Sequence, residues 1–134
     1  MQYENHNSKN YELLHRFMAG MRLDSVMVKH LRHGNDVGLS AAWVDIRDSS
    51  AYINLKDGGK PVRYQLLLNK NEIRKLASDL QQASTTIIPL RIEVKDMQHL
   101  HRQVFKVMIA SARGLRQHDK RKRLIAEIHR KEMK

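Results

Sequence analysis

The fold should be decided by residues 39–94, which read LSAAWVDIRDSSAYINLKDGGKPVRYQLLLNKNEIRKLASDLQQASTTIIPLRIEV. Two runs rich in Ala, Val, Ile and aromatic residues, 39–46 and 51–55, flank the turn-forming residues RDSS. This arrangement predicts a β-hairpin. The second run alternates apolar and polar side chains, so one face of the hairpin should be buried.

A long helix is expected after the hairpin. Apolar residues between Val62 and Gln82 recur at helical spacing. Pro61 suits a first helical turn, where its missing N–H would have no partner. Asn69 followed by Glu72 has the spacing of a capping box, so the helix could break or restart there.

Residues 87–94 alternate as a third strand, and Pro89 places the start of that strand at a sheet edge. Helical spacing also recurs before the hairpin, over 11–21 and 23–31, and again beyond Asp96. The sequence therefore predicts an α+β fold with N-terminal helices, a β-hairpin, a long helix, a third strand and C-terminal basic helices. We divide it into a flexible N-terminus (1–10), an α+β domain (11–95) and a basic helical C-terminal extension (96–134).

The charge of the chain favours a polyanionic partner. The 134 residues carry a net charge of +11, of which 1–95 contribute +4 and 96–134 contribute +7. A basic balance of this size attracts phosphate backbones. The sequence holds no cysteine, which excludes disulfides and thiolate sites. No apolar run resembles a signal peptide or a membrane span, so we expect a cytoplasmic protein with no membrane partner.

Candidate nucleic-acid contacts concentrate in the C-terminal extension. The run Lys120-Arg121-Lys122-Arg123 is the sharpest local signal, although a charge run is often only a solvated helix face. Four further basic residues of the extension add to it: Arg102, Lys106, Arg113 and Arg116.

Tyrosines of the central segment are candidates for stacking on unpaired bases. Tyr52 and Tyr64 could each stack in this way, as in sheet-based single-strand binders, or could pack as ordinary half-buried residues. Trp43 is expected in the core.

An enzymatic alternative rests on Glu93-Val94-Lys95. An acid-x-Lys step on a strand, with an upstream carboxylate such as Asp45, resembles the metal-binding core of a nuclease class. The plain interpretation is the alternation of any amphipathic strand. The histidines are scattered, and no Gly-rich phosphate loop is present. We therefore expect a protein that is not an enzyme and has neither cofactor nor metal.

The order of the segments resembles the DciA-like family, small bacterial proteins tied to the replicative DNA helicase. The resemblance covers about 11–95. It rests on LDSVMVKHL, on the hairpin AAWVDIRDSSAYINLKD, on Arg63-Tyr64-Gln65 before LLLNKNEIRKLASDL, and on IIPLRIEVK. Members of that family usually carry a small-Trp-small triplet before the Arg step, where this chain has Gly58-Gly59-Lys60-Pro61.

The resemblance implies a KH-like fold and a non-enzymatic adaptor that recruits or loads the replicative helicase. The expected partners are then DNA, single-stranded or duplex, and the helicase itself. Arg63 and Tyr64 become candidates for the DNA or partner surface, beside the basic residues of the extension. Two alternatives stay open: a KH-like RNA-binding or ribosome-associated module, and a small metal-dependent nuclease using Glu93 and Lys95.

Overall fold

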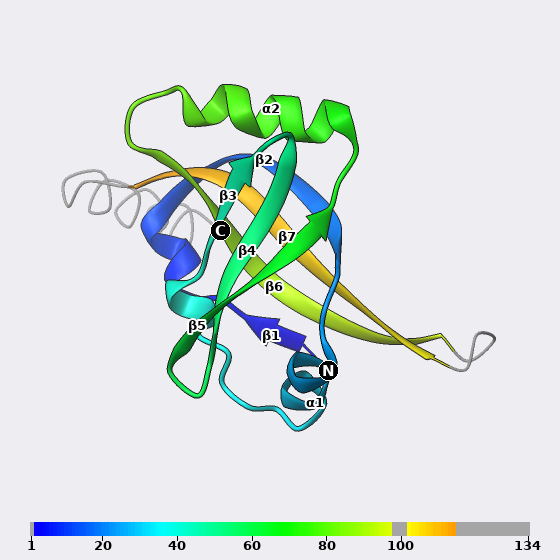
Figure 1. Cartoon of the computed structure of the whole chain (residues 1–134). Helices are drawn as coiled ribbons and strands as arrows, with labels where there is room; N and C mark the ends of the chain where they lie inside the picture. Colours follow the sequence, from blue (N-terminus) through cyan, green and yellow to red (C-terminus); the bar gives the residue numbers. More distant parts are fainter. Residues whose placement is uncertain (1, 98–101, 115–134) are drawn as a thin grey trace, which may run out of the picture.

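Strands dominate the described part of the chain. The computed structural model describes residues 2–97 and 102–114 (Figure 1). Its strands are β1 (Gln2–Glu4), β2 (Tyr11–Met21), β3 (Trp43–Arg47), β4 (Ser50–Asp57), β5 (Lys60–Leu67), β6 (Thr85–Met97) and β7 (Arg102–Gly114). The helical elements described are α1 (Ser25–Arg32), α2 (Lys70–Leu80) and two 3-10 turns, η1 (His6–Asn10) and η2 (Leu39–Ala41).

The antiparallel sheet closes on itself as a barrel. Its strand order is β1-β6-β3-β4-β5-β2-β7, and β7 also pairs with β6, so β1 lies outside the closed ring. The β3–β6 seam is a single pair, Val44 with Ile87, whereas β7 pairs along most of its length with both β2 and β6. Closure therefore depends mainly on β7.

The two α-helices lie at opposite ends of the barrel (Figure 1). Asp24 caps α1 by accepting a hydrogen bond of 2.8 Å from the Met27 backbone N–H, and Met27 and Leu31 are fully buried. Asn69 and Glu72 form a capping box at the start of α2, whose Leu76 is fully buried. Each helix thus adds its apolar face to the barrel core.

The expected helix-rich, KH-like α+β fold is wrong. Residues 11–21, expected as a helix, form β2. The pairing of β2 with β7 passes from Leu13 directly to His15, which marks a β-bulge. The bulge shifts the alternation of the strand, and Phe17 and Ala19 then pack in the core. Because the bulge interrupts the two-residue alternation of a strand, the apolar residues of 11–21 recur at spacings of three and four, as they would in a helix.

The expected long helix over 62–82 is wrong in its first half, where β5 lies. Val62, Tyr64 and Leu66 alternate into the core, a period of two that the run of three leucines conceals in the sequence. The predicted restart at Asn69 is confirmed, because α2 begins directly after that cap.

The helix expected after Asp96 is also wrong over 102–114, where β7 buries Phe105, Val107 and Ile109. The final helix expected from Asp119 lies outside the described residues. The hairpin is confirmed as β3–β4, with Asp48 and Ser49 at positive φ in its two-residue turn. The short helix expected over 23–31 is confirmed as α1.

Pro89 is buried inside β6 and not at the expected edge. It sits at a register shift, opposite Ile109 of β7. Asn5 donates from its backbone to the Leu90 carbonyl (2.8 Å) and from its side chain to the Pro89 carbonyl (2.7 Å). The N-terminal segment thereby supplies hydrogen-bond donors to the two β6 carbonyls next to the register shift at the proline.

A buried carboxylate ties α2 to the barrel wall. Asp79 is 5% exposed and accepts hydrogen bonds from the Ser111 hydroxyl of β7 (2.6 Å) and the His15 Nδ1 of β2 (2.7 Å). Burial alone raises the pKa of Asp79, but the bonds from Ser111 and His15 outweigh it and hold that pKa below its usual value.

Replacing Asp79 should therefore destabilise the fold. We expect Asp79→Ala to lower the free energy of unfolding by about 2 kcal/mol at neutral pH, because the buried Ser111 hydroxyl and the partly exposed His15 ring lose their charged acceptor. The folded-state pKa lies below the unfolded value of about 3.9, so this contribution is present above that pH and is lost on further acidification. Urea unfolding at several pH values measures it.

The exposed Glu4 provides the control for this prediction. Glu4→Ala should change stability by less than about 0.5 kcal/mol. Equal losses in the two variants, or a loss in Asp79→Ala that does not shrink in acid, would contradict the assignment of Asp79 as the tie between α2 and the barrel.

Candidate nucleic-acid interface

The outward face of β3, β4 and β5 carries aromatic and basic side chains. Alternation sends Val44, Ile53 and Leu66 inward, so the intervening residues face away from the core. The outward residues form two rows across the strands. Trp43, Asn54 and Arg63 are in register in one row, and Asp45, Tyr52 and Gln65 are in register in the next.

Asp45 organises the middle of this face. It pairs with Arg63 and with Arg47, whose Nε lies 3.3 Å from the carboxylate, and it accepts a hydrogen bond of 3.1 Å from Asn54. The Arg63 guanidinium also lies over the Tyr52 ring, with Cζ 4.8 Å from the ring centroid. The guanidinium is therefore held in orientation by a carboxylate and an aromatic ring.

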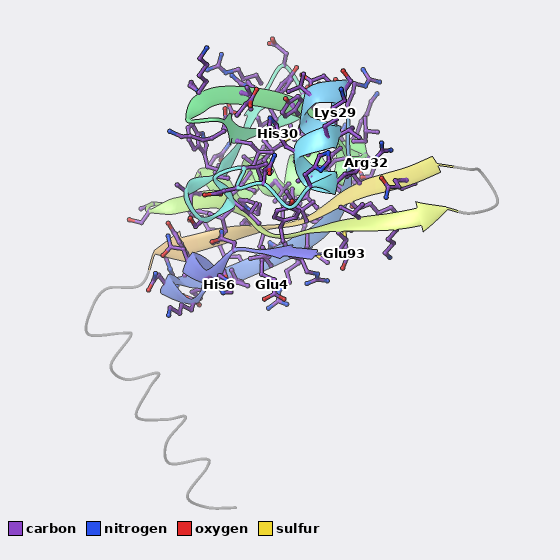
Figure 2. All side chains as sticks on the ribbon, turned by 90° about the horizontal axis from the view of Figure 1, so that it is seen from below. Glu4, His6, Lys29, His30, Arg32 and Glu93 are labelled. Atoms are coloured by element: carbon purple, nitrogen blue, oxygen red, sulfur yellow. The ribbon has the colours of Figure 1, made fainter. Side chains whose placement is uncertain are left out.

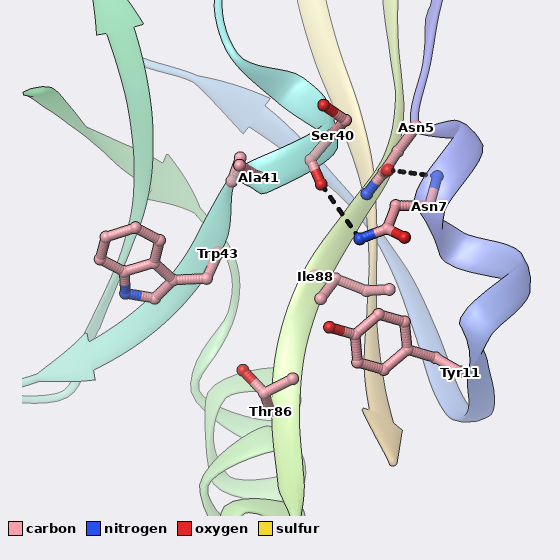
Figure 3. A pocket seen from close by; sticks show the side chains of 9 residues that line it. Asn5, Asn7, Tyr11, Ser40, Ala41, Trp43, Thr86 and Ile88 are labelled. Carbon is pink, nitrogen blue, oxygen red and sulfur yellow. Dashed lines mark hydrogen bonds between the residues drawn. The ribbon is translucent and has the colours of Figure 1, made fainter. Parts of the chain in front are cut away.

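A small pocket adjoins this face at Trp43 (Figure 3). It has a volume of about 150 Å³ and a mixed polar and apolar lining. Figure 3 shows Tyr11, Thr86 and Ile88 grouped on one side of β3, whereas the Trp43 ring points away from them. Trp43 itself is 50% exposed.

Asparagines from the N-terminal segment frame the pocket. The Asn5 side chain accepts a hydrogen bond of 3.0 Å from the Asn7 backbone N–H, and the Asn7 amide donates to the Ser40 carbonyl at 3.4 Å. Exposed aromatic surface beside amide donors and acceptors matches the needs of a nucleobase, which has a stacking face and a hydrogen-bonding edge.

Tyr64, a predicted contact residue, lies on the core side of β5 and is 9% exposed. Its hydroxyl donates to the Asp24 carboxylate, with both oxygens 3.2 Å away. Burial, followed by the charge of Asp24, raises the pKa of Tyr64 to about 12. The tyrosine thus joins β5 to the cap of α1.

The other predicted contact residues fall in three places. Arg63 lies on the outward face described above. On β7, Lys106 stands opposite Glu93, and Arg113 pairs with Glu12 at 2.6 Å. Arg102 opens β7. Arg116, Lys120, Arg121, Lys122 and Arg123 lie outside the described residues.

Glu93 forms ion pairs with its β6 neighbours Arg91 and Lys95. Glu93 accepts a hydrogen bond from Arg91 (3.0 Å) and lies 3.6 Å from the Lys95 ammonium. The hydrogen bond from Arg91 is the main cause of its lowered pKa. Glu93 pairs with Gln2 at the start of β1, as Figure 2 shows. Within 2–97 and 102–114, no group of three or more His, Asp or Glu residues could hold a metal ion.

Comparison with known proteins decides the family. The family model described as SmpB protein matches residues 2–134. The chain belongs to the SmpB family. It is 34% identical to the SsrA-binding protein of Deinococcus radiodurans over 125 residues, covering 84% of this chain and 81% of that protein. It is 34% identical to the SsrA-binding protein of Chlamydia muridarum over 137 residues, covering 92% and 85%.

A solved structure of the SmpB family has a similar fold. It is described as "tmRNA-SmpB: a journey to the center of the bacterial ribosome" and superposes with a TM-score of 0.64 at 27% identity. The superposition covers 90% of this chain and 92% of the other. The match supports the closed barrel as the fold of this family.

The SmpB assignment corrects the DciA-like resemblance. The DNA and replicative-helicase partners expected from that resemblance are wrong, and the RNA-binding or ribosome-associated alternative fits the SmpB relatives. The expectation of a protein that is not an enzyme is confirmed by the family, whose members are named for binding. No helix within the described ranges is long and apolar enough to cross a membrane.

Several residues of this interface escaped the sequence analysis. Trp43 was expected in the core but is half exposed, because it starts β3 on the outward side of the alternation. Tyr11, Asn5 and Asn7 looked like parts of a helix and a frayed end. The alternation of Trp43, Asp45 and Arg47 against Val44 and Ile46 was the signal that could have placed Trp43 outside.

Tyr64→Phe should separate stability from binding. The variant loses the hydrogen bond to Asp24 and should lose about 1–2 kcal/mol of unfolding free energy at neutral pH. The pKa of Tyr64 is raised, so this difference should hold up to about pH 10 and fall as pH rises toward the folded value of about 12. Urea unfolding provides the measurement. Weaker nucleic-acid binding in a fully folded Tyr64→Phe protein would show that Tyr64 has a role outside the core.

Proposed function

We propose that the protein binds tmRNA, the SsrA RNA, and acts with it on the ribosome. The membership in the SmpB family supports this proposal, because relatives are named SsrA-binding protein and a similar structure is described with tmRNA and the ribosome. The net charge of +11 suits an RNA partner.

The single structural observation that carries the proposal is the open Tyr11–Trp43 pocket. Trp43 is 50% exposed, and the pocket beside it is lined by the side chains of Asn5, Asn7 and Tyr11. In this proposal an unpaired base of the RNA stacks on the exposed Trp43 ring.

Basic residues complete the proposed interface by contacting phosphates. Lys106, Arg113 and Arg102 of β7 contribute positive charge, and so do Arg116 and the run Lys120 to Arg123. Contacts of this kind supply affinity without sequence preference. They also make binding weaken steeply with salt, roughly in proportion to the number of phosphates contacted.

Trp43→Ala tests the pocket directly. We expect affinity for tmRNA to fall about tenfold, the usual loss for one stacked base, with no more than a small change in stability. Trp43→Phe should retain part of the affinity because it keeps a smaller stacking surface. Filter binding or fluorescence anisotropy with tmRNA, at fixed salt, gives the affinities.

Two comparisons make the result specific. Lys75→Gln removes one exposed charge from α2, away from the pocket, and should leave affinity within about twofold. A duplex DNA of similar length should bind more weakly than tmRNA at the same salt. Equal binding of DNA and tmRNA, together with no effect of Trp43→Ala, would refute the proposed RNA function.

A further inference from the structure

We propose that the outward face of β3, β4 and β5 binds a second unpaired nucleotide, whose base stacks on the Arg63 guanidinium above Tyr52. This inference rests on the proposed RNA function and extends it beyond the Trp43 pocket. The site consists of Arg63, Tyr52 and Asp45, with Asn54 between them and Trp43. Its occupant is single-stranded RNA.

The Arg63–Tyr52 pair provides a flat stacking surface. The Arg63 Cζ lies over the Tyr52 ring, 4.8 Å from its centroid, and the Arg63 side chain is 34% exposed. Guanidinium planes stack on bases as aromatic rings do, and they add positive charge near the phosphates. Because Asp45 and Tyr52 already fix the guanidinium, little side-chain freedom is lost when a base binds.

The geometry of the strands links this site to the pocket. Trp43, Asn54 and Arg63 stand in register in one row across β3, β4 and β5. Neighbouring strands are about 4.8 Å apart, so Trp43 and Arg63 are separated by about 10 Å of sheet. A strand crossing the sheet along this row would place one base at Trp43 and another at Arg63, with the Asn54 amide between them.

The charge of the face also suits RNA. Arg47, Lys56 and Arg63 outnumber the single carboxylate Asp45, and Arg47 is 69% exposed. Asp45 stands at the centre, where it repels phosphate. The bound strand therefore presents its bases to the sheet and directs its phosphates toward Arg47 and Lys56 at the margins.

The test uses a single-stranded RNA hexanucleotide and the full-length protein. We expect Tyr52→Leu to weaken hexanucleotide binding about tenfold, and Tyr52→Phe to bind like the parent. Arg63→Lys keeps the charge but not the planar group. Its affinity for the hexanucleotide should therefore fall by nearly the same tenfold, while the salt dependence of binding stays unchanged. Lys75→Gln is the matched charge control, and urea unfolding verifies that each variant is folded.

A further variant probes the carboxylate. Asp45→Asn removes the central negative charge, so it should strengthen binding of any polyanion. The preference of the Asp45→Asn variant for single-stranded RNA over an RNA duplex of equal length should decrease. An unchanged preference would count against a role for Asp45 in selecting bases.

The outcomes separate this inference from the proposed function. If Trp43→Ala weakens RNA binding while folded Tyr52→Leu and Arg63→Lys bind like the parent, the second site is wrong and the pocket stands. If these two variants affect only ribosome co-sedimentation and not the hexanucleotide, the face binds a protein or folded RNA and the inference is also wrong. If no RNA binds above the level of duplex DNA, both proposals fail.

Discussion

The double pairing of β7 is the constraint on which the rest of the structure depends. Both edges of this strand are occupied, by β2 on one side and β6 on the other, while the β3–β6 and β2–β5 seams are short. With no free edge along most of its length, β7 can bury the consecutive residues 109–112 completely. The same strand supplies Ser111 to the Asp79 tie, so the position of α2 also depends on it.

Local signals in the sequence predicted the elements formed by neighbouring residues. The β3–β4 hairpin, α1 and the Asn69 cap each depend on turn or capping residues within a few positions of one another. The long-range strands β2, β5 and β7 were expected as helices. Their apolar residues mimic helical spacing where a bulge, a leucine run or burial on both faces obscures the period of two. Only the partners across the barrel determine that these segments are extended.

The candidate site was predictable only in part, because some of its residues are neighbours in sequence and others meet only in the folded barrel. Arg63 and Tyr64 are adjacent in sequence and were assigned together, but alternation along β5 sends one outward and the other into the core. Once the strand is known, their different roles follow. The pocket was not predictable, because the N-terminal turn, the start of β3 and the middle of β6 meet there only in the closed barrel.

The Asn5 contacts with Pro89 and Leu90 link the N-terminal segment to both the barrel wall and the pocket. Asn5 is 4% exposed and donates hydrogen bonds to the Pro89 and Leu90 carbonyls of β6, so the first residues close this part of the barrel wall. Proteolytic removal of residues 2–10 would remove one wall of the Tyr11–Trp43 pocket and would leave the Pro89 and Leu90 carbonyls without the Asn5 donors. RNA binding and stability would therefore decrease together.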